Sequence, residues 1–297
     1  MMAQSGVKSG AGGLLLSAWF ALLLCLVAGQ GAARDATDAA ALDRRVLMSG
    51  HSLTDRLLEP LGWMVREAGG PVGVVARSTI PGSPLDWRWN NRTAPPDARE
   101  DIGDFDMLVI TERVALSTTR EWHDSDGWAL RWAHHAWANG AGGAGADVLL
   151  YAGWVARHVD PQTSDDPDAA LPWRERLDRE YVWWLEILAH VNANRPEGAS
   201  EMRMIPASMV LAAAHDAILA GQAPARLDDM EAFFRDDIHL STLGAYLVAM
   251  THFAVIYRRD PTELRAPPRV DGAVWSWMAR LVQEVVLSHP ETGVAPG

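Results

Sequence analysis

The chain has 297 residues, a formal net charge of −12 and 48% hydrophobic residues. This apolar content is enough for a large buried core, whereas the acidic balance excludes nucleic acid as an expected partner, because polyphosphate binding needs a basic face. Cys25 is the only cysteine, which excludes an intramolecular disulfide.

The first 33 residues have the order of a secretory signal peptide. Lys8 supplies a positive charge, residues 14–28 form an apolar run, and residues 31–33 (Gly-Ala-Ala) offer a cleavage site. The run is shorter than the ~20 residues that a membrane-spanning helix needs. We therefore expect a cleaved signal peptide at 1–33, no stable membrane insertion afterwards, and a secreted or periplasmic protein of bacterial type; a retained anchor is the alternative. Because Cys25 lies in this segment, the mature chain would lack cysteine.

The remainder, residues 34–297, is expected to form a single domain. In chain order, hydrophobic patterns predict strand 45–49, helix 53–67, strands 72–76 and 106–111, helix 118–139, strand 147–151, helix 174–193, strand 202–205, and helices 240–257 and 273–287. Short apolar strands that alternate with longer helices favour a three-layer α/β/α fold with a central, mostly parallel five-stranded sheet. The catalytic groups of such sheets gather at the carboxyl ends of the strands.

Residues 49–55 (Ser-Gly-His-Ser-Leu-Thr-Asp) follow the first expected strand and open the first helix. Ser52 would lie at the helix N-terminus, where free backbone N–H groups favour the negative charge that develops on an attacked carbonyl oxygen. The alternative is an ordinary capping serine, since Asp55 follows it at the spacing of a loose capping pattern.

Residues 236–241 (Asp-Asp-Ile-His-Leu-Ser) precede an apolar helix near the end of the chain. A serine hydroxyl needs an adjacent base, usually an imidazole that a carboxylate orients. Asp236 lies three residues before His239, so it can turn back within the same loop and hold the imidazole. The alternative is a surface loop in which Ser241 caps the following helix.

Together these motifs resemble the SGNH/GDSL hydrolase superfamily. Residues 50–53 (Gly-His-Ser-Leu) are similar to its first block, and residues 236–241 with Gly244 are similar to its last block, which supplies the aspartate and the histidine. Residues 204–207 (Met-Ile-Pro-Ala) are similar to its fifth strand. The resemblance covers residues 45–257, and it implies a flavodoxin-like sheet with Ser52 as nucleophile and His239 and Asp236 as its base pair.

The resemblance also implies an oxyanion hole with three donors. These would be the N–H of the serine, a glycine N–H after the second strand and an asparagine side chain after the third. Gly82 stands where the glycine belongs, although a turn glycine beside proline is the alternative.

The asparagine is missing, because the third strand continues into Thr111, Glu112 and Arg113. An ionised Glu112 cannot donate a hydrogen bond. Losing one donor costs about 3 kcal/mol of transition-state stabilisation. Three alternatives remain open: a protonated Glu112, donation by Thr111 or by Asn90 and its neighbour Asn91, or an impaired enzyme.

The expected function is hydrolysis of a small acyl ester, with an acetyl group on an extracytoplasmic carbohydrate as the favoured substrate. Indole faces suit sugar rings, and several tryptophans fall in or beside the strand-end loops (Trp87, Trp89, Trp122, Trp128 and Trp154). The alternative for these tryptophans, and the one that base rates favour, is packing in the core or between helices. The reaction needs no cofactor, and His123, His134 and His135 lack the spacing of a metal site. The alternatives are an O-acetyltransferase with the same acyl-serine intermediate and a non-catalytic glycan-binding protein.

Overall fold

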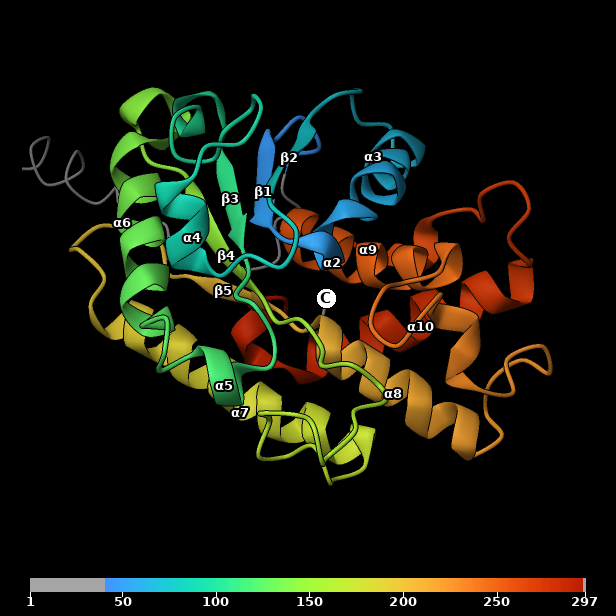
Figure 1. The fold of residues 1–297 in the computed structure, drawn as a ribbon. Helices are drawn as coiled ribbons and strands as arrows, with labels where there is room; N and C mark the ends of the chain where they lie inside the picture. The colour runs from blue at the N-terminus through green and yellow to red at the C-terminus, as the bar shows by residue number, and fades with distance from the viewer. Residues whose placement is uncertain (1–40, 296–297) are drawn as a thin grey trace, which may run out of the picture. The chain divides into compact units, whose positions relative to one another are not determined.

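A parallel sheet of five strands lies at the centre of residues 41–295, the part of the chain that the structure, a computed structural model, describes (Figure 1). The spatial order of the strands is β2-β1-β3-β4-β5, and every neighbouring pair is parallel. The three-layer α/β/α prediction is confirmed, with a sheet that is parallel throughout. The strands are β1 (Val46–Gly50), β2 (Val75–Thr79), β3 (Met107–Ile110), β4 (Asp147–Tyr151) and β5 (Arg203–Ile205).

Helices cover both faces of this sheet. They are α2 (Ser52–Asp55), α3 (Leu58–Glu67), α4 (Leu85–Asn90), α5 (Leu116–Thr119), α6 (Ser125–Gly143), α7 (Trp173–Ala193), α8 (Ala207–Leu219), α9 (Thr242–Tyr257) and α10 (Gly272–Ser288). Single 3₁₀ turns lie at Ile102–Asp104, Met230–Phe233, Pro261–Glu263 and Pro290–Thr292.

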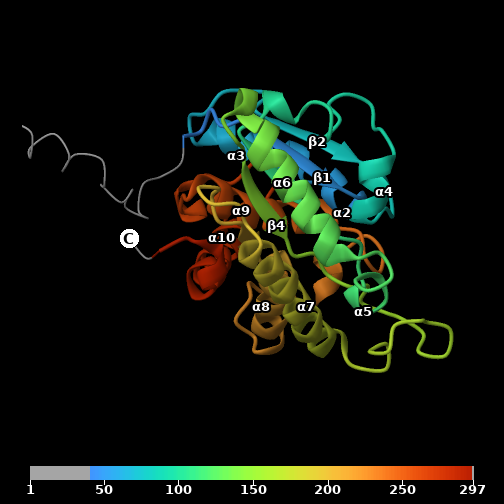
Figure 2. The same ribbon diagram turned by 90° about the vertical axis from the view of Figure 1, so that its left-hand side faces the viewer.

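Alternate residues of each strand enter two separate cores. Val46 and Met48 of β1 pack with α3, α8, α9 and α10, whereas Leu47 between them packs with α4, α6 and α7. In Figure 2, α6 crosses in front of the strands. Because successive side chains of a strand point to opposite faces, a strand buried on both faces must be apolar at every position, as all of β3 is.

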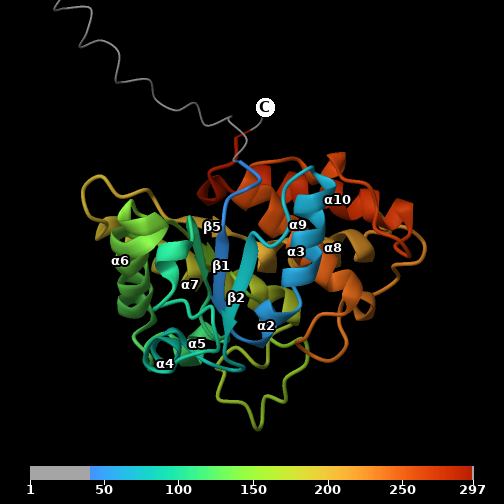
Figure 3. The same cartoon turned by 90° about the horizontal axis from the view of Figure 1, so that it is seen from above.

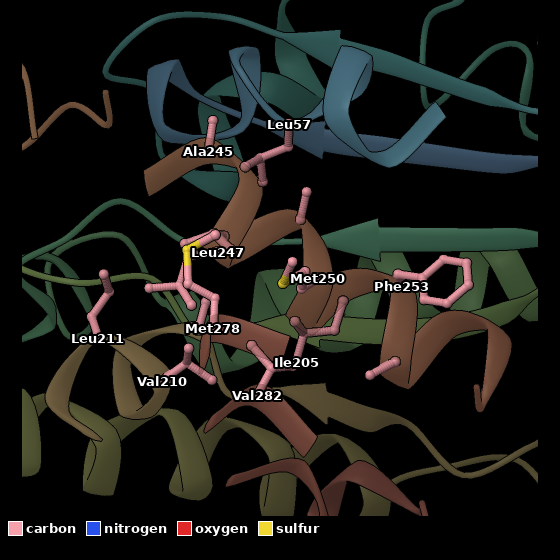
Figure 4. Close-up of a cluster of buried hydrophobic side chains, with 14 of the residues drawn as sticks. Leu57, Ile205, Val210, Leu211, Ala245, Leu247, Met250, Phe253, Met278 and Val282 are labelled. Atoms are coloured by element: carbon pink, nitrogen blue, oxygen red, sulfur yellow. The ribbon is translucent and has the colours of Figure 1, made fainter. Parts of the chain in front are cut away.

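Helix α9 is enclosed by other elements, and its side chains are almost all apolar. Nearly all of its residues are buried, including Leu247, Met250 and Phe253. These side chains meet Leu57 and Ile205 in the interior (Figure 4). A helix that is apolar on all sides is expected at such a buried place. The burial of α9 therefore fixes the position of its N-terminus, which directly follows the motif at residues 236–241.

The structure differs from the predicted elements in several places. Strand β2 begins three residues later than expected, because Gly73 takes a positive φ of 77° and Val72 is 73% exposed in the turn before it. The helix expected at 53–67 is divided into α2 and α3, and the helix expected at 118–139 is divided into α5 and α6. Helices α4 and α8 were not predicted.

No helix of the described residues is long and apolar enough to cross a membrane. Within residues 41–295, no group of three or more His, Cys, Asp and Glu side chains could hold a metal ion. The predicted signal peptide at 1–33 lies outside the described residues.

Candidate active site

Ser52, His239 and Asp236 form a continuous chain of hydrogen bonds. The Nε2 atom of His239 lies 3.0 Å from the Oγ atom of Ser52, although 187 residues separate the two in sequence. On the other side of the ring, Nδ1 lies 3.0 and 3.1 Å from the two carboxylate oxygens of Asp236. A carboxylate can only accept there, so Nδ1 carries the proton and Nε2 is free to accept from the serine hydroxyl. The structure therefore brings the three predicted residues together in the order that nucleophilic catalysis needs.

Ser52 owes its position to the residues just before it. Strand β1 ends at Gly50, where a Cβ atom would lie 2.0 Å from Oγ1 of Thr54, so a larger residue would displace the first turn of α2. His51 is 4% exposed, and its Nε2–H donates to the carbonyl oxygen of Glu112 over 3.0 Å. Its Nδ1 accepts from the N–H of Leu53. Figure 3 shows α2 at the carboxyl end of β1.

Burial keeps His51 neutral. Burial, and then the nearby charge of Arg88, lower the pKa of His51 to about 4. An uncharged ring can satisfy both of its neighbours at once, one as donor and one as acceptor. His51 thus links the loop after β1 to the loop after β3.

Asp236 shapes the loop that carries His239. Its Oδ1 atom accepts hydrogen bonds from the backbone N–H of Ile238 at 3.0 Å and of His239 at 2.7 Å. These backbone hydrogen bonds, that of His239 first, lower the pKa of Asp236 to about 2. The carboxylate is therefore ionised at neutral pH and can stabilise an imidazolium on His239.

The loop is also tied to its surroundings. The Nε1–H of Trp154, a buried residue after β4, donates to the carbonyl oxygen of Ile238 over 2.8 Å. Ser241 caps α9 by accepting from the N–H of Gly244. A Cβ atom on Gly244 would lie 2.0 Å from the carbonyl oxygen of Phe233, so this position requires glycine. The capping role and the catalytic geometry of this motif thus occur together.

Gly82 lies in the exposed turn between β2 and α4. Its φ is +66°, a conformation that glycine adopts readily and other residues rarely do. Within the described residues its N–H donates to no backbone or side-chain acceptor. The same holds for the N–H of Ser52, which opens α2 and so has no intrahelical acceptor. Two free backbone donors are therefore available on the loops after β1 and β2.

Glu112 is a buried link between loops. Its side chain is fully buried, and its Oε1 atom accepts from the N–H of Leu85 at 3.0 Å and of Arg113 at 2.6 Å. Burial raises the pKa of Glu112, and the positive charge of Arg88 opposes that rise. The carboxyl group therefore connects the start of α4 to the loop after β3.

Arg88 strengthens the same connection from the other side. It is 4% exposed, and its two terminal nitrogens donate to the carbonyl oxygens of Ser83 and Thr111. Arg88 was not singled out in the sequence, because an arginine in an expected surface loop gives no sign of burial. Its only sequence signal is the apolar spacing of Leu85 and Trp89 around it, which marks a short amphipathic helix.

The other proposed donors have partners elsewhere. The Thr111 hydroxyl donates to the carbonyl oxygen of Tyr151 over 2.8 Å. The amide of Asn90 donates to the carbonyl of Asp86 on its own helix, and that of Asn91 donates to the carbonyl of Trp87. These side chains therefore stabilise the loops in which they lie.

A cavity of about 250 Å³ adjoins the His239 loop. Its wall combines apolar side chains, Val155 and Ile238 among them, with Arg113 and Arg176. Neither arginine was singled out in the sequence as a site residue. Arg113 comes three residues after the end of β3, so its position at a strand end was the available signal.

No protein-family model matches the chain, and no curated protein matches it by sequence. Among solved structures, a DUF4886 family protein from Bacteroides uniformis ATCC 8492 is similar, with 17% identity, a TM-score of 0.62, and coverage of 83% of this chain and 95% of that protein. A GDSL-like lipase from Bacteroides thetaiotaomicron VPI-5482 is 14% identical, with a TM-score of 0.42 and coverage of 71% and 85%.

An acetyl xylan esterase is 13% identical, with a TM-score of 0.41 and coverage of 71% of this chain and 98% of that protein. At these identities the similarity concerns the fold alone.

Proposed function

We propose that the protein is a serine ester hydrolase that removes a small acyl group, of which acetyl is the favoured example, from an extracytoplasmic carbohydrate. The observation that carries this proposal is the 3.0 Å contact between the Ser52 hydroxyl and the His239 imidazole, whose other nitrogen is held by Asp236. A protein that only binds glycans does not need a hydroxyl, a base and an orienting carboxylate joined by hydrogen bonds in that order.

The chemistry follows from the geometry. The Ser52 oxygen attacks the ester carbonyl while His239 takes its proton at Nε2, and Asp236 stabilises the resulting imidazolium. His239 then returns the proton to the leaving alcohol, and a water molecule cleaves the acyl-serine. The free N–H groups of Ser52 and Gly82 are the proposed backbone donors to the oxyanion.

Exposed tryptophans support a carbohydrate substrate. Trp87 is 55% exposed and Trp122 is 84% exposed, and both follow strands whose carboxyl ends face the site. An exposed indole offers an apolar face with a polar N–H, which suits a sugar ring. Trp154, in contrast, is buried, and its indole N–H donates to the carbonyl oxygen of Ile238.

Hydrolysis is favoured over transfer to a sugar by the exposure of the base. The His239 side chain is 28% exposed and that of Asp236 is 49% exposed, so water can reach the acyl-serine. Export to the periplasm or the medium is part of the proposal and rests on the sequence of residues 1–33.

The test is steady-state hydrolysis of an activated acetyl ester by the purified protein and by Ser52→Ala. We expect turnover in the parent and a loss of several orders of magnitude in the variant, since removal of a triad member leaves only residual catalysis. Equal rates would show that Ser52 is not the nucleophile. If product forms faster with an added sugar acceptor, as an acetylated sugar, the transferase alternative replaces hydrolysis.

A further inference from the structure

Arg113 lies on the loop that faces the nucleophile. At Gly153, a Cβ atom would lie 3.6 Å from Cγ1 of Val114 and 3.9 Å from Cδ1 of Leu53, so the residue after Arg113 and the residue after Ser52 converge on one point. Arg113 also lines the cavity that Ile238 closes beside His239. The loop that carries Arg113 therefore adjoins both the loop of the serine and the loop of the histidine.

The backbone of Arg113 is fixed while its charge is free. Its N–H is held by the buried carboxyl group of Glu112 at 2.6 Å. Its side chain is exposed, and within residues 41–295 its guanidinium forms no hydrogen bond or ion pair. Asp165 and Asp166 line the same cavity, but Asp166 accepts from Ser117 Oγ and from the N–H of Asp168.

The positive charge of Arg113 is felt at the residue next to the nucleophile. It is among the causes that hold the pKa of His51 low, after burial and the charge of Arg88. A guanidinium presents five N–H donors in a rigid plane and stays protonated throughout the accessible pH range. The guanidinium of Arg113 can therefore donate to the carbonyl oxygen of the substrate while that oxygen carries a negative charge.

We propose that Arg113 is a catalytic residue that donates to the oxyanion, a role that neither Thr111 nor Glu112 is free to take. This inference rests on the proposed esterase function. As the Ser52 oxygen bonds to the carbonyl carbon, the π electron pair of the carbonyl moves onto its oxygen and the hydroxyl proton moves to His239. The guanidinium donates to that oxygen, and the contact is lost when the C=O bond re-forms and the alcohol leaves.

Arg113→Met tests the proposal, because methionine keeps much of the side-chain length without charge or donors. With a neutral acetyl ester, we expect kcat to fall about a hundredfold, as for the loss of one oxyanion donor, with little change in KM. Arg113→Lys should retain part of the rate. The matched control is Arg280→Met, an exposed arginine on α10, which should match the parent. The thermal midpoint of Arg113→Met should equal that of the parent.

A second measurement follows binding without turnover. An alkyl boronic acid forms a tetrahedral anionic adduct on a serine oxygen, so its inhibition constant should rise in Arg113→Met along with the loss of kcat. An Arg113→Met enzyme as fast as Arg280→Met overturns this inference and leaves the esterase intact. If KM rises in Arg113→Met, and only for esters that carry a carboxylate, the inference is also overturned, because Arg113 would then bind the substrate and not the oxyanion. An inert parent overturns the esterase proposal and this inference with it.

Discussion

A hydroxyl group attacks an ester only when a base is held at its proton, and here two short loops meet that requirement. Ser52 follows β1, and His239 lies in a turn that the carboxylate of Asp236 closes through two backbone N–H groups. The same carboxylate thus folds the loop and orients the ring. This double use explains why Asp236 lies three residues before His239.

Asp236→Asn separates these two tasks. The amide oxygen can still accept from the N–H of Ile238 and of His239, so the loop should persist, but the charge that stabilises the imidazolium is removed. We expect kcat to fall by about 10⁴, as for the loss of the carboxylate in other serine triads. Asp237→Asn is the matched control, since that carboxylate contacts His158 instead. Equal rates for the two asparagine variants would rule out the proposed role of Asp236.

The sequence could predict these three residues because each lies in a short local motif. It could not predict the surroundings of the site to the same extent. Burial of Glu112 and Arg88, and the free charge of Arg113, depend on which loops meet in space. Glu112 therefore looked like a defect in an oxyanion hole, whereas the structure places its carboxyl group in contact with the backbone of Leu85 and Arg113.

At the scale of elements, buried polar side chains join the loops after β1, β2 and β3. Each of these side chains finds its hydrogen-bond partners on more than one loop. Glu112 accepts backbone N–H groups from two loops, Arg88 donates to carbonyl oxygens on two loops, and His51 donates to the carbonyl of Glu112. Long loops become precise supports for a site when such buried hydrogen bonds hold them.

Glu112→Ala should therefore destabilise the protein. It removes the acceptor of two N–H groups and leaves the buried charge of Arg88 without its neighbouring carboxyl group. We expect the free energy of unfolding to fall by about 3 kcal/mol or more. Chemical denaturation measures it, with exposed Glu197→Ala as the control. Unchanged stability in Glu112→Ala would contradict the proposed link between the loops.

The same scale explains which elements the sequence could predict. Strands β1, β3 and β4 are buried on both faces, so their continuous apolar runs are clear. Strand β2 lies at the edge of the sheet and is partly polar, so the apolar residues just before it were taken for the strand instead. Helix α8 is rich in alanine, and its few polar residues, among them His215 and Asp216, form too small a face to give a helical period that could be recognised.

At the scale of the whole molecule, the core that contains Leu47, α4, α6 and α7 is linked to the loops around the site by one buried carboxyl group, that of Glu180. Glu180 of α7 is 4% exposed, and its Oε1 atom accepts from the N–H of Leu116 at the start of α5. Burial, and then the charges of Asp166 and Asp168, raise the pKa of Glu180 to about 8 against the opposing effect of that hydrogen bond.

The raised pKa of Glu180 makes stability depend on pH. Its contribution is fully present below the unfolded-state pKa of 4.5 and is lost as pH rises through about 8, because the folded state holds a proton that the unfolded state releases. Glu180→Gln keeps the acceptor without the charge. Its free energy of unfolding should exceed that of the parent above pH 8, by on the order of 5 kcal/mol. The difference should vanish near pH 4.5. A difference that does not vary with pH would show that Glu180 titrates normally.

Covalent labelling of the nucleophile tests the central claim most directly. The purified protein is treated with a fluorophosphonate, which reacts with activated serines, and the modified peptide is identified by mass spectrometry. The account predicts one adduct, on Ser52, that forms much more slowly in His239→Ala and is absent in Ser52→Ala. An unlabelled Ser52, or one labelled equally fast without His239, would contradict it.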